Sequence, residues 1–247
     1  MQTENDTIVL MKGLTEKIKI LRFEQDAPED FEDLVLSEKS FTLFLNGNPA
    51  AKFICVNSGI KELTAGHLLC EGRISSIKEL KSVLIDDESG HVYAETIKTK
   101  SAAGAKKGVA SIDIPPAPVS VNYAAIVSAL KEFQEMSPLF KETGCMHSAA
   151  LLNNEYVFRY FAEDIGRYNA VEKVIGKAFL DGFNLPGAML VASSRMPLEL
   201  IQIAYRAGIN AVISVSAPTL EGIRFARENK IILIGMFRGN RINIYAH

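Results

Sequence analysis

The chain has few cysteines, no long apolar run and no marked excess of one charge. Its three cysteines, Cys55, Cys70 and Cys145, are widely spaced among 247 residues, and no C-x-x-C pair occurs. An odd, scattered set of this kind is no disulfide framework and is typical of a reducing compartment. No apolar run approaches the ~20 residues that a membrane helix needs, and the polar segment 1–17 lacks the apolar centre of a signal peptide. We therefore expect a cytoplasmic protein without a membrane segment.

The charge balance and the composition narrow the class of protein further. A net charge of -2 argues against a basic surface that coats nucleic acid, so we expect no nucleic-acid partner. Hydrophobic residues make up 48% and charged residues 23% of the chain, as in soluble globular proteins with a substantial core.

The first half has the pattern of a small, β-rich α+β domain. Residues 1–14 are expected to be a flexible lead, and residues 15–110 to form this domain. The predicted elements are a strand at 17–23, a hairpin over 41–56 around Asn46-Gly47, a helix at 60–70, a second hairpin over 83–97 and a loop at 98–108 rich in lysine and glycine.

The second half, residues 115–247, alternates strands and helices regularly. Such units imply an α/β domain with parallel strands and right-handed crossovers. A first helix is predicted at 121–134, and a last strand at 241–245 is predicted to be antiparallel at a sheet edge. Between them we predict strands at 156–161, 188–192, 211–215 and 231–236, and helices at 165–180, 197–207 and 218–229.

Polar residues cluster at three of the predicted strand–helix junctions. These junctions are Glu163–Arg167, Ser193–Pro197 and Ser214–Thr219. Ligands of parallel α/β sheets bind where strands end and helices begin, and helix N-termini with arginines suit anions. The alternative is ordinary helix capping by Asp164, Ser194 and Ser216. The segment 237–241 adds two arginines, with a solvated hairpin tip as its alternative interpretation.

A fourth polar cluster surrounds Cys145 and His147. The pair could serve as metal ligands, as an activated thiol or as neither. Zinc needs more ligands than this cluster offers, and the H-x-E and P-C-x-x-C signature of zinc deaminases is absent. We therefore expect no zinc, a Cys145 packed at a turn, and a His147 that binds a ligand or forms a hydrogen bond. Cys55 and Cys70 are expected to be buried and inert, and His67 to be a core or interface histidine.

Taken together, these segments resemble the formate dehydrogenase accessory family of FdhD-type sulfur-carrier proteins. The resemblance runs from about residue 40 to residue 247. It rests on the segments 45–49, 63–72, 143–149, 163–176, 214–219, 234–238 and 244–245. It implies a cytidine-deaminase-like, three-layer α/β domain beside the smaller N-terminal domain. It also implies a cytoplasmic homodimer that assists molybdenum-dependent formate dehydrogenases and receives sulfur from a cysteine desulfurase.

The cargo that the resemblance implies is the bis(molybdopterin guanine dinucleotide) form of the molybdenum cofactor. Its two pyrophosphates suit helix N-termini and arginine side chains. The family's cofactor-binding segment falls on residues 237–242. The candidate binding residues are therefore His147, Asp164, Arg167, Ser193, Arg195, Ser214, Ser216, Thr219, Phe237, Arg238, Gly239, Asn240, Arg241 and Ile242.

The chain departs from the family at the sulfur-carrying pair of cysteines. The family holds its C-x-x-C pair in a loop that corresponds to 101–108 here, where Ala103 and Lys106 occupy the cysteine positions. Neither side chain can hold a persulfide. Three hypotheses follow: a cofactor-binding protein without the sulfur relay, a sulfurtransferase that uses Cys145, or a non-catalytic module that binds a partner protein.

Overall fold

The structure is a computed structural model that describes residues 13–24, 26–97 and 121–247. Most of the expected N-terminal lead, the loop at 98–108 with Ala103 and Lys106, and the expected boundary between the domains lie outside these residues. Within the described part, no helix is both long and apolar enough to span a bilayer.

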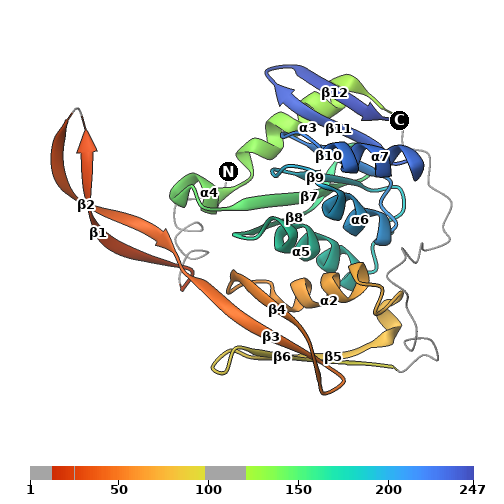
Figure 1. Ribbon diagram of the computed structural model, residues 1–247, viewed down its shortest axis with the longest axis horizontal. Coiled ribbons are helices and arrows are strands. Elements are labelled where there is room, and N and C mark those ends of the chain that lie inside the picture. The colour runs from red at the N-terminus through yellow and green to blue at the C-terminus, as the bar shows by residue number, and fades with distance from the viewer. Residues whose placement is uncertain (1–12, 25, 98–120) are drawn as a thin grey trace.

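The second half forms a six-stranded mixed sheet in the order β12-β11-β10-β9-β7-β8 (Figure 1). The predicted parallel pairing of β9, β10 and β11 is confirmed, and β12 is an antiparallel edge strand, as expected. The strands are β7 (His147–Leu152), β8 (Phe158–Asp164), β9 (Met189–Ala192), β10 (Ala211–Ser214), β11 (Ile232–Arg238) and β12 (Arg241–Ala246).

Strand β7 was not predicted, and it corrects the expected series of parallel neighbours. It lies between β8 and β9 and is antiparallel to both. Its sequence, mostly small residues after the turn at Gly144, was assigned to the Cys145 cluster instead. Because β8 still runs in the same direction as β9, both strands end at the same edge of the sheet.

Helices cover both faces of this sheet. On one face, α3 (Tyr123–Glu135) packs through Ile126, Leu130 and Phe133 against alternate residues of β7, β9, β10 and β11. The opposite face carries α5 (Arg167–Leu180), α6 (Leu198–Arg206) and α7 (Leu220–Glu228). The short helix α4 (Pro138–Thr143), which was not predicted, precedes β7.

The first half forms a four-stranded sheet in the order β4-β3-β6-β5, covered by one helix. Both predicted hairpins and the predicted helix are confirmed. The elements are β3 (Glu38–Leu45), β4 (Asn48–Val56), α2 (Ile60–Cys70), a short 3-10 turn η1 (Ile77–Glu79), β5 (Leu80–Asp86) and β6 (His91–Thr96). Helix α2 lies between this sheet and α5 (Figure 1).

A separate two-stranded ribbon, β1 (Thr15–Glu24) and β2 (Ala27–Leu36), projects away from the rest of the molecule (Figure 1). The predicted strand at 17–23 lies within β1, which is longer. The acidic sequence of β2 gave no strand signal, because charged residues interrupt its apolar ones. We call this ribbon, residues 15–36, the arm.

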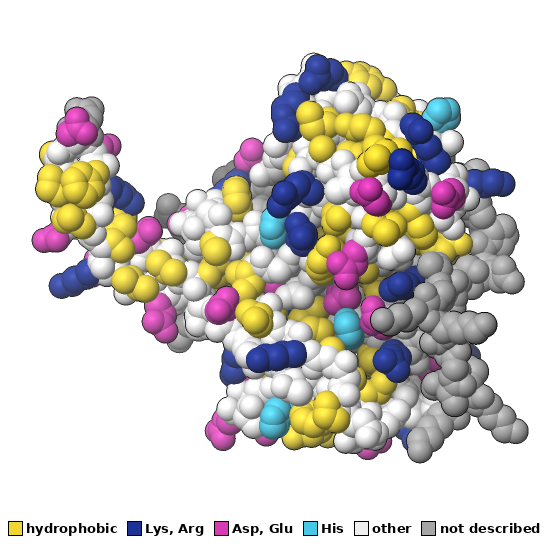
Figure 2. Space-filling view, viewed as in Figure 1, with side chains coloured by type: hydrophobic (Ala, Val, Ile, Leu, Met, Phe, Trp, Pro, Cys, Tyr) yellow, Lys and Arg dark blue, Asp and Glu magenta, His cyan; other side chains and the backbone are white. Residues whose placement is uncertain are grey.

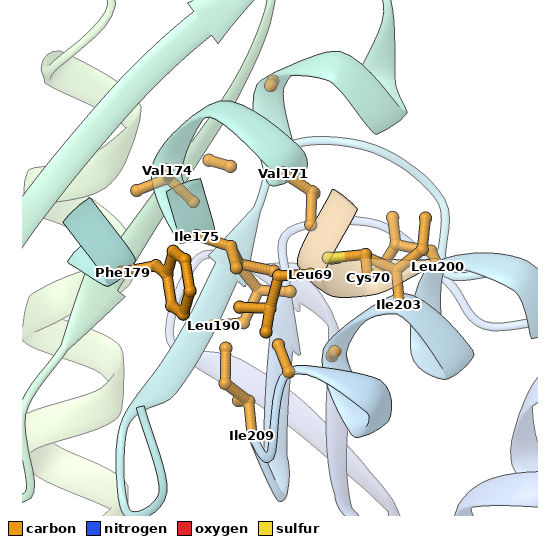
Figure 3. Packing of buried hydrophobic residues seen from close by; sticks show 14 of the residues in the cluster. Leu69, Cys70, Val171, Val174, Ile175, Phe179, Leu190, Leu200, Ile203 and Ile209 are labelled. Carbon is orange, nitrogen blue, oxygen red and sulfur yellow. The ribbon is translucent and has the colours of Figure 1, made fainter. Parts of the chain in front are cut away.

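One hydrophobic cluster joins the two halves of the chain. Leu69 and Cys70 of α2 lie close to Val171 and Ile175 of α5, with residues of α6 and β9 around them (Figure 3). The helices approach closely at Gly66 and Gly176, where an added Cβ atom would overlap a carbonyl oxygen of the facing helix. Small residues are therefore required at this crossing.

A partly buried ion pair also links α2 to α5. The Nδ1 atom of His67 lies 3.1 Å from Glu172 Oε1, and the His67 ring meets Phe53 edge to face. His67 is thus an interface histidine, as expected. Burial disfavours the charged ring, but the hydrogen bond and the charge of Glu172 outweigh it and raise the pKa of His67 above its ordinary value of 6.5.

We expect this pair to stabilise the fold at acid rather than alkaline pH. A group whose pKa is raised by folding contributes its stability below its unfolded pKa, and that contribution is lost as the pH rises through the folded pKa. The free energy of unfolding, measured with urea, should therefore fall as the pH is raised from about 6. The variant His67→Phe should lack this part of the pH dependence, and an unchanged profile would contradict the assignment.

Candidate functional site

The carboxyl ends of β8, β9, β10 and β11 lie at one edge of the large sheet, together with the amino end of β7. His147, the first residue of β7, pairs in register with Asp164, the last residue of β8. Ser193 directly follows β9, and its Oγ lies 3.5 Å from His147 Nδ1. The predicted strand–helix junctions are therefore neighbours, and His147 lies among them.

The loops at this edge are tied together by backbone hydrogen bonds. Met196 N donates to Ala217 O (3.1 Å), and Thr219 N donates to Met196 O (3.1 Å). Met236 N donates to Ser216 O (2.8 Å), which brings in the end of β11. At Gly235 an added Cβ would come within 2.6 Å of Ser216 O. The loops after β9 and β10 and the end of β11 thus form one pre-organised surface.

The charges of two arginines from different junctions act on His147. Burial lowers the pKa of His147, and the charges of Arg167 and Arg195 lower it further, against a smaller opposing effect of Asp164. Among the described residues, neither arginine forms an ion pair with a carboxylate. The nearby Asp164 carboxylate is paired with Lys173, so the two arginine charges near the imidazole form a site that favours an anion.

Tyr168 contacts Arg167 and Glu199 acts on Tyr168, and neither is among the residues predicted to bind a ligand. The Arg167 guanidinium lies 5.0 Å from the centroid of the Tyr168 ring, within cation–π range. Burial, a hydrogen bond with Glu199 and the Glu199 charge raise the pKa of Tyr168. Tyr168 therefore links the start of α5 to the first turn of α6. The sequence signal that could have indicated Tyr168 is an aromatic residue directly after a candidate arginine.

The turn between β11 and β12 contributes the remaining basic residues. Arg238 Nη1 donates to Val215 O (3.0 Å) and Phe237 O (2.7 Å), so the side chain bends toward the loop after β10. Arg241 is its register partner and is exposed, as are Gly239 and Asn240 between them, while Ile242 is half-buried. Figure 2 shows arginine and lysine side chains, with a histidine beside some of them, on the face that carries these strand ends.

Three predicted binding residues are buried, so their side chains do not face a ligand. Asp164 and Ser214 are 0% exposed, and Phe237 belongs to the core beneath α3. The Ser214 hydroxyl donates to Ser194 O (2.7 Å) and accepts from Ser216 N (2.9 Å). These side chains shape the loops, whereas His147, Arg167, Ser193, Arg195, Ser216, Thr219, Arg238, Gly239, Asn240, Arg241 and Ile242 retain solvent exposure.

Asp164 instead fastens the two halves of the chain. It forms a 2.5 Å ion pair with Lys173, whose side chain is only 4% exposed. Its other contacts are the backbone N–H groups of Val56 (3.3 Å) and Gly166 (2.8 Å) and the amide of Asn169 (2.9 Å). The carboxylate is thus surrounded by donors from β4 and α5, which suits a buried charge.

The capping alternative is also corrected. The residues at the N-caps of α5, α6 and α7 are Gly166, Pro197 and Thr219, rather than Asp164, Ser194 and Ser216. Only Thr219 caps its helix with its side chain, accepting from Gly222 N (3.2 Å). The serines at the junctions therefore serve other purposes than N-capping.

The cysteines divide into two buried residues and one exposed residue. Cys55 and Cys70 are buried, as predicted. Burial first, and then repulsion by Asp164, raises the pKa of Cys55 to about 12, so its thiol stays protonated. Cys145, by contrast, is exposed rather than packed at its turn. It directly follows Gly144, whose left-handed conformation ends α4.

The described residues hold no cluster of metal ligands, and a hollow lies apart from this site. No group of three or more potential metal ligands occurs in the described ranges. A hollow of about 970 Å³ lies on the opposite side of β8, between the ends of α3 and α4 and the starts of α2 and β1. None of the predicted binding residues lines it.

Comparison with known proteins gives a consistent result. The model of the FdhD/NarQ family matches residues 36–247. The sulfur carrier protein FdhD of Wolinella succinogenes is 34% identical over 87% of this chain and 82% of its own length. The Bacillus subtilis protein of the same name is 31% identical over 92% and 94% of the two chains.

A solved structure shows the same fold. It is that of a protein from Desulfotalea psychrophila proposed to be a formate dehydrogenase accessory protein, with a TM-score of 0.80 and 24% identity over 95% of this chain and 97% of that one. Because the family model covers most of the chain and the relatives align almost end to end, this chain belongs to the FdhD/NarQ family.

Proposed function

We propose that this chain is an accessory protein of a molybdenum-dependent formate dehydrogenase and binds the enzyme's bis(molybdopterin guanine dinucleotide) cofactor at the basic sheet edge. The observation that carries the proposal is the position of His147 beside the junctions that bear Arg167 and Arg195, where neither arginine forms an ion pair with a carboxylate among the described residues. Guanidinium groups bind phosphate oxygens in a bidentate manner. A guanine dinucleotide presents a pyrophosphate with such oxygens. The cofactor would be cargo rather than a resident group.

The surrounding groups suit the rest of such a ligand. The half-buried hydroxyls of Ser193 and Ser216 can donate to phosphate or ribose oxygens. A neutral His147 can donate through one ring nitrogen and accept through the other. The N-terminus of α5 adds the positive end of a helix dipole at the same edge.

The proposed partners rest on the names of the relatives. Relatives are named sulfur carrier proteins, and the Desulfotalea protein is linked to formate dehydrogenase. We extend both to this chain as proposals: a formate dehydrogenase and a cysteine desulfurase as partners, a homodimer as the assembly and the cytoplasm as the location. We also retain the cytidine-deaminase-like class, which the antiparallel β7 inside an otherwise parallel run supports.

Replacing Arg195 with alanine should weaken the binding of GDP, a fragment of the cofactor, by about 10- to 100-fold, because a charged hydrogen bond contributes about 1.5–3 kcal/mol. Isothermal calorimetry on the full chain measures this change. Arg159→Ala, an exposed arginine in β8 at the far side of the strand, is the matched control and should bind as the wild type does. Equal weakening by both variants would indicate non-specific charge attraction.

Sulfur transfer is a second candidate function, favoured by one observation. Cys145 is exposed and Cys55 and Cys70 are buried, so Cys145 is the cysteine that a partner can reach. A desulfurase would pass the outer sulfur of its persulfide to the Cys145 thiolate, regenerating its own thiol. The expected result is ³⁵S label on the wild type and none on Cys145→Ser. An unlabelled wild type would leave the binding function alone.

A further inference from the structure

Arg167 begins α5 without a carboxylate to hold its side chain. It is the first residue of the helix and is half-buried. Among the residues that the structure describes, it takes part in no ion pair. A long side chain that must be immobilised when a ligand binds lowers the affinity for that ligand. An anion site at this edge therefore gains if another group fixes Arg167 beforehand.

The neighbouring Tyr168 fixes the guanidinium group. The ring centroid of Tyr168 lies 5.0 Å from the guanidinium carbon of Arg167, within the range of a cation–π contact. The hydroxyl of Tyr168 also accepts a hydrogen bond from Arg167. The ring is itself held in place, because it packs against the hydrophobic cluster that joins the two halves of the chain.

Glu199 in turn holds the hydroxyl of Tyr168. Glu199 is an exposed residue in the first turn of α6, and its carboxylate forms a hydrogen bond with that hydroxyl. A tyrosine hydroxyl can donate one hydrogen bond and accept another, so it donates to Glu199 and accepts from Arg167. Burial first, and then the hydrogen bond and charge of Glu199, raises the pKa of Tyr168. The hydroxyl therefore remains a donor.

The tyrosine between the two charges explains how Arg167 is held and still attracts an anion. A carboxylate bonded directly to Arg167 would fix the side chain, but it would also occupy the donors that bind phosphate oxygens. An uncharged phenol ring separates the negative charge of Glu199 from the guanidinium, and attraction between charges falls with distance. The arrangement thus restricts the arginine without an ion pair.

We propose that Tyr168 and Glu199 are positioning residues of the anion site, in which Glu199 holds Tyr168 and Tyr168 holds Arg167 ready for a diphosphate. The ligand in this inference rests on the proposed function. Because Tyr168 lies on α5 and Glu199 on α6, two helices together determine the position of Arg167. Glu199 therefore promotes the binding of an anion although it carries a negative charge itself.

The direction of the effect of Glu199 tests this role. Removing a negative charge near an anion site tightens binding if charge alone matters, whereas a loss of positioning weakens it. Glu199→Ala and Tyr168→Phe in the full chain should each raise the Kd for GDP about 3- to 10-fold, the effect of immobilising one long side chain on binding. The double variant should bind no more weakly than either single variant, because both remove the same hydrogen bond. Isothermal calorimetry measures these constants.

Glu221→Ala is the matched control. Glu221 is an exposed acid in the first turn of α7, the next helix at the same edge. Its removal changes the charge alone and should leave the Kd for GDP unchanged or lower it. A Glu199→Ala protein that binds GDP as tightly as the wild type, or more tightly, overturns the positioning role. Equal weakening by Glu221→Ala overturns it as well.

A second measurement needs no ligand and separates this inference from the proposed function. Burial and then the charge of Arg167 lower the pKa of His147, so an Arg167 released toward solvent should let this pKa rise toward its ordinary value of 6.5. Titration of the His147 ring by NMR should show the rise in both Tyr168→Phe and Glu199→Ala, although the lost charge of Glu199 alone would lower the pKa.

The two measurements have distinct outcomes. An unchanged or lowered pKa of His147 in both variants overturns the positioning role, whether or not GDP binds. A wild type that binds no GDP at millimolar concentration, together with a raised pKa of His147 in both variants, overturns the proposed ligand and supports the positioning role. Tyr168→Phe keeps the ring in its packed place, so this variant tests the hydroxyl without removing the core contact.

Discussion

Replacing Asp164 with alanine is expected to destabilise the folded protein by about 3–5 kcal/mol, because it leaves the buried Lys173 ammonium without its counter-ion. The same substitution removes the acceptor for the backbone N–H groups of Val56 and Gly166. The loss is a large part of the ~5–15 kcal/mol stability of a typical domain. Chemical denaturation of the full chain measures it.

Two further variants test the cause. Asp87→Ala removes a carboxylate from an exposed pair with Lys39, in which the Asp87 side chain is 60% exposed, and should cost less than ~1 kcal/mol. Asp164→Ala combined with Lys173→Met removes both buried charges and should recover part of the stability. If Asp164→Ala costs no more than Asp87→Ala, the buried pair does not fasten the two halves of the chain.

Alanine at Gly176 is expected to cost about 3 kcal/mol or more, since overpacking a tight contact strains the backbone. The new Cβ would overlap the carbonyl oxygen of Glu62 in α2, and it would also come within 2.6 Å of Gly66 N. The two helices would have to separate. Thermal unfolding should then shift downward by roughly 6–12 °C for a chain of this size.

Lys177→Ala is the control for this change. Lys177 follows Gly176 in α5 but is exposed, and its substitution should change stability by no more than about 0.5 kcal/mol. Gly66→Ala should behave like Gly176→Ala, because its Cβ would overlap Glu172 O. A Gly176→Ala protein as stable as the control would mean that α2 and α5 are not in close contact.

The strands and helices of the α/β half could be predicted because their periodicity is strong and regular. Strand β7 could not, since His147–Leu152 contains small residues that pack well in a strand yet carry no clear alternation. Strand β2 could not be predicted because charged residues interrupt its apolar ones. Its charged residues are tolerated because the ribbon is largely solvent-exposed, and local sequence does not indicate that environment.

The candidate site was predicted in part. The position of ligand sites in parallel sheets correctly indicated that Arg167, Ser193 and Arg195 would meet at one edge. The same rule could not distinguish residues whose side chains face this edge from residues that are buried beneath it. Asp164 looks like a ligand-binding or capping residue in sequence, but its role depends on Lys173, nine residues later, and on Val56 in the other half of the chain.

The segment 163–176 therefore has two physical roles. Arg167 faces the basic edge. Asp164, Asn169 and Lys173 form hydrogen bonds with the backbone of β4. Glu172 and Gly176 contact α2. The site and the junction between the two halves thus share one helix. Substitutions that loosen the junction are expected to affect ligand binding as well, through the position of Arg167.

The most direct test of the proposed binding site is a crystal structure of the full chain soaked with GDP. The proposal predicts density for the diphosphate at the edge formed by β7, β9 and β10, with its oxygens within hydrogen-bond distance of Arg167 and Arg195 and close to His147. Density for GDP elsewhere, or none at millimolar ligand, would contradict it.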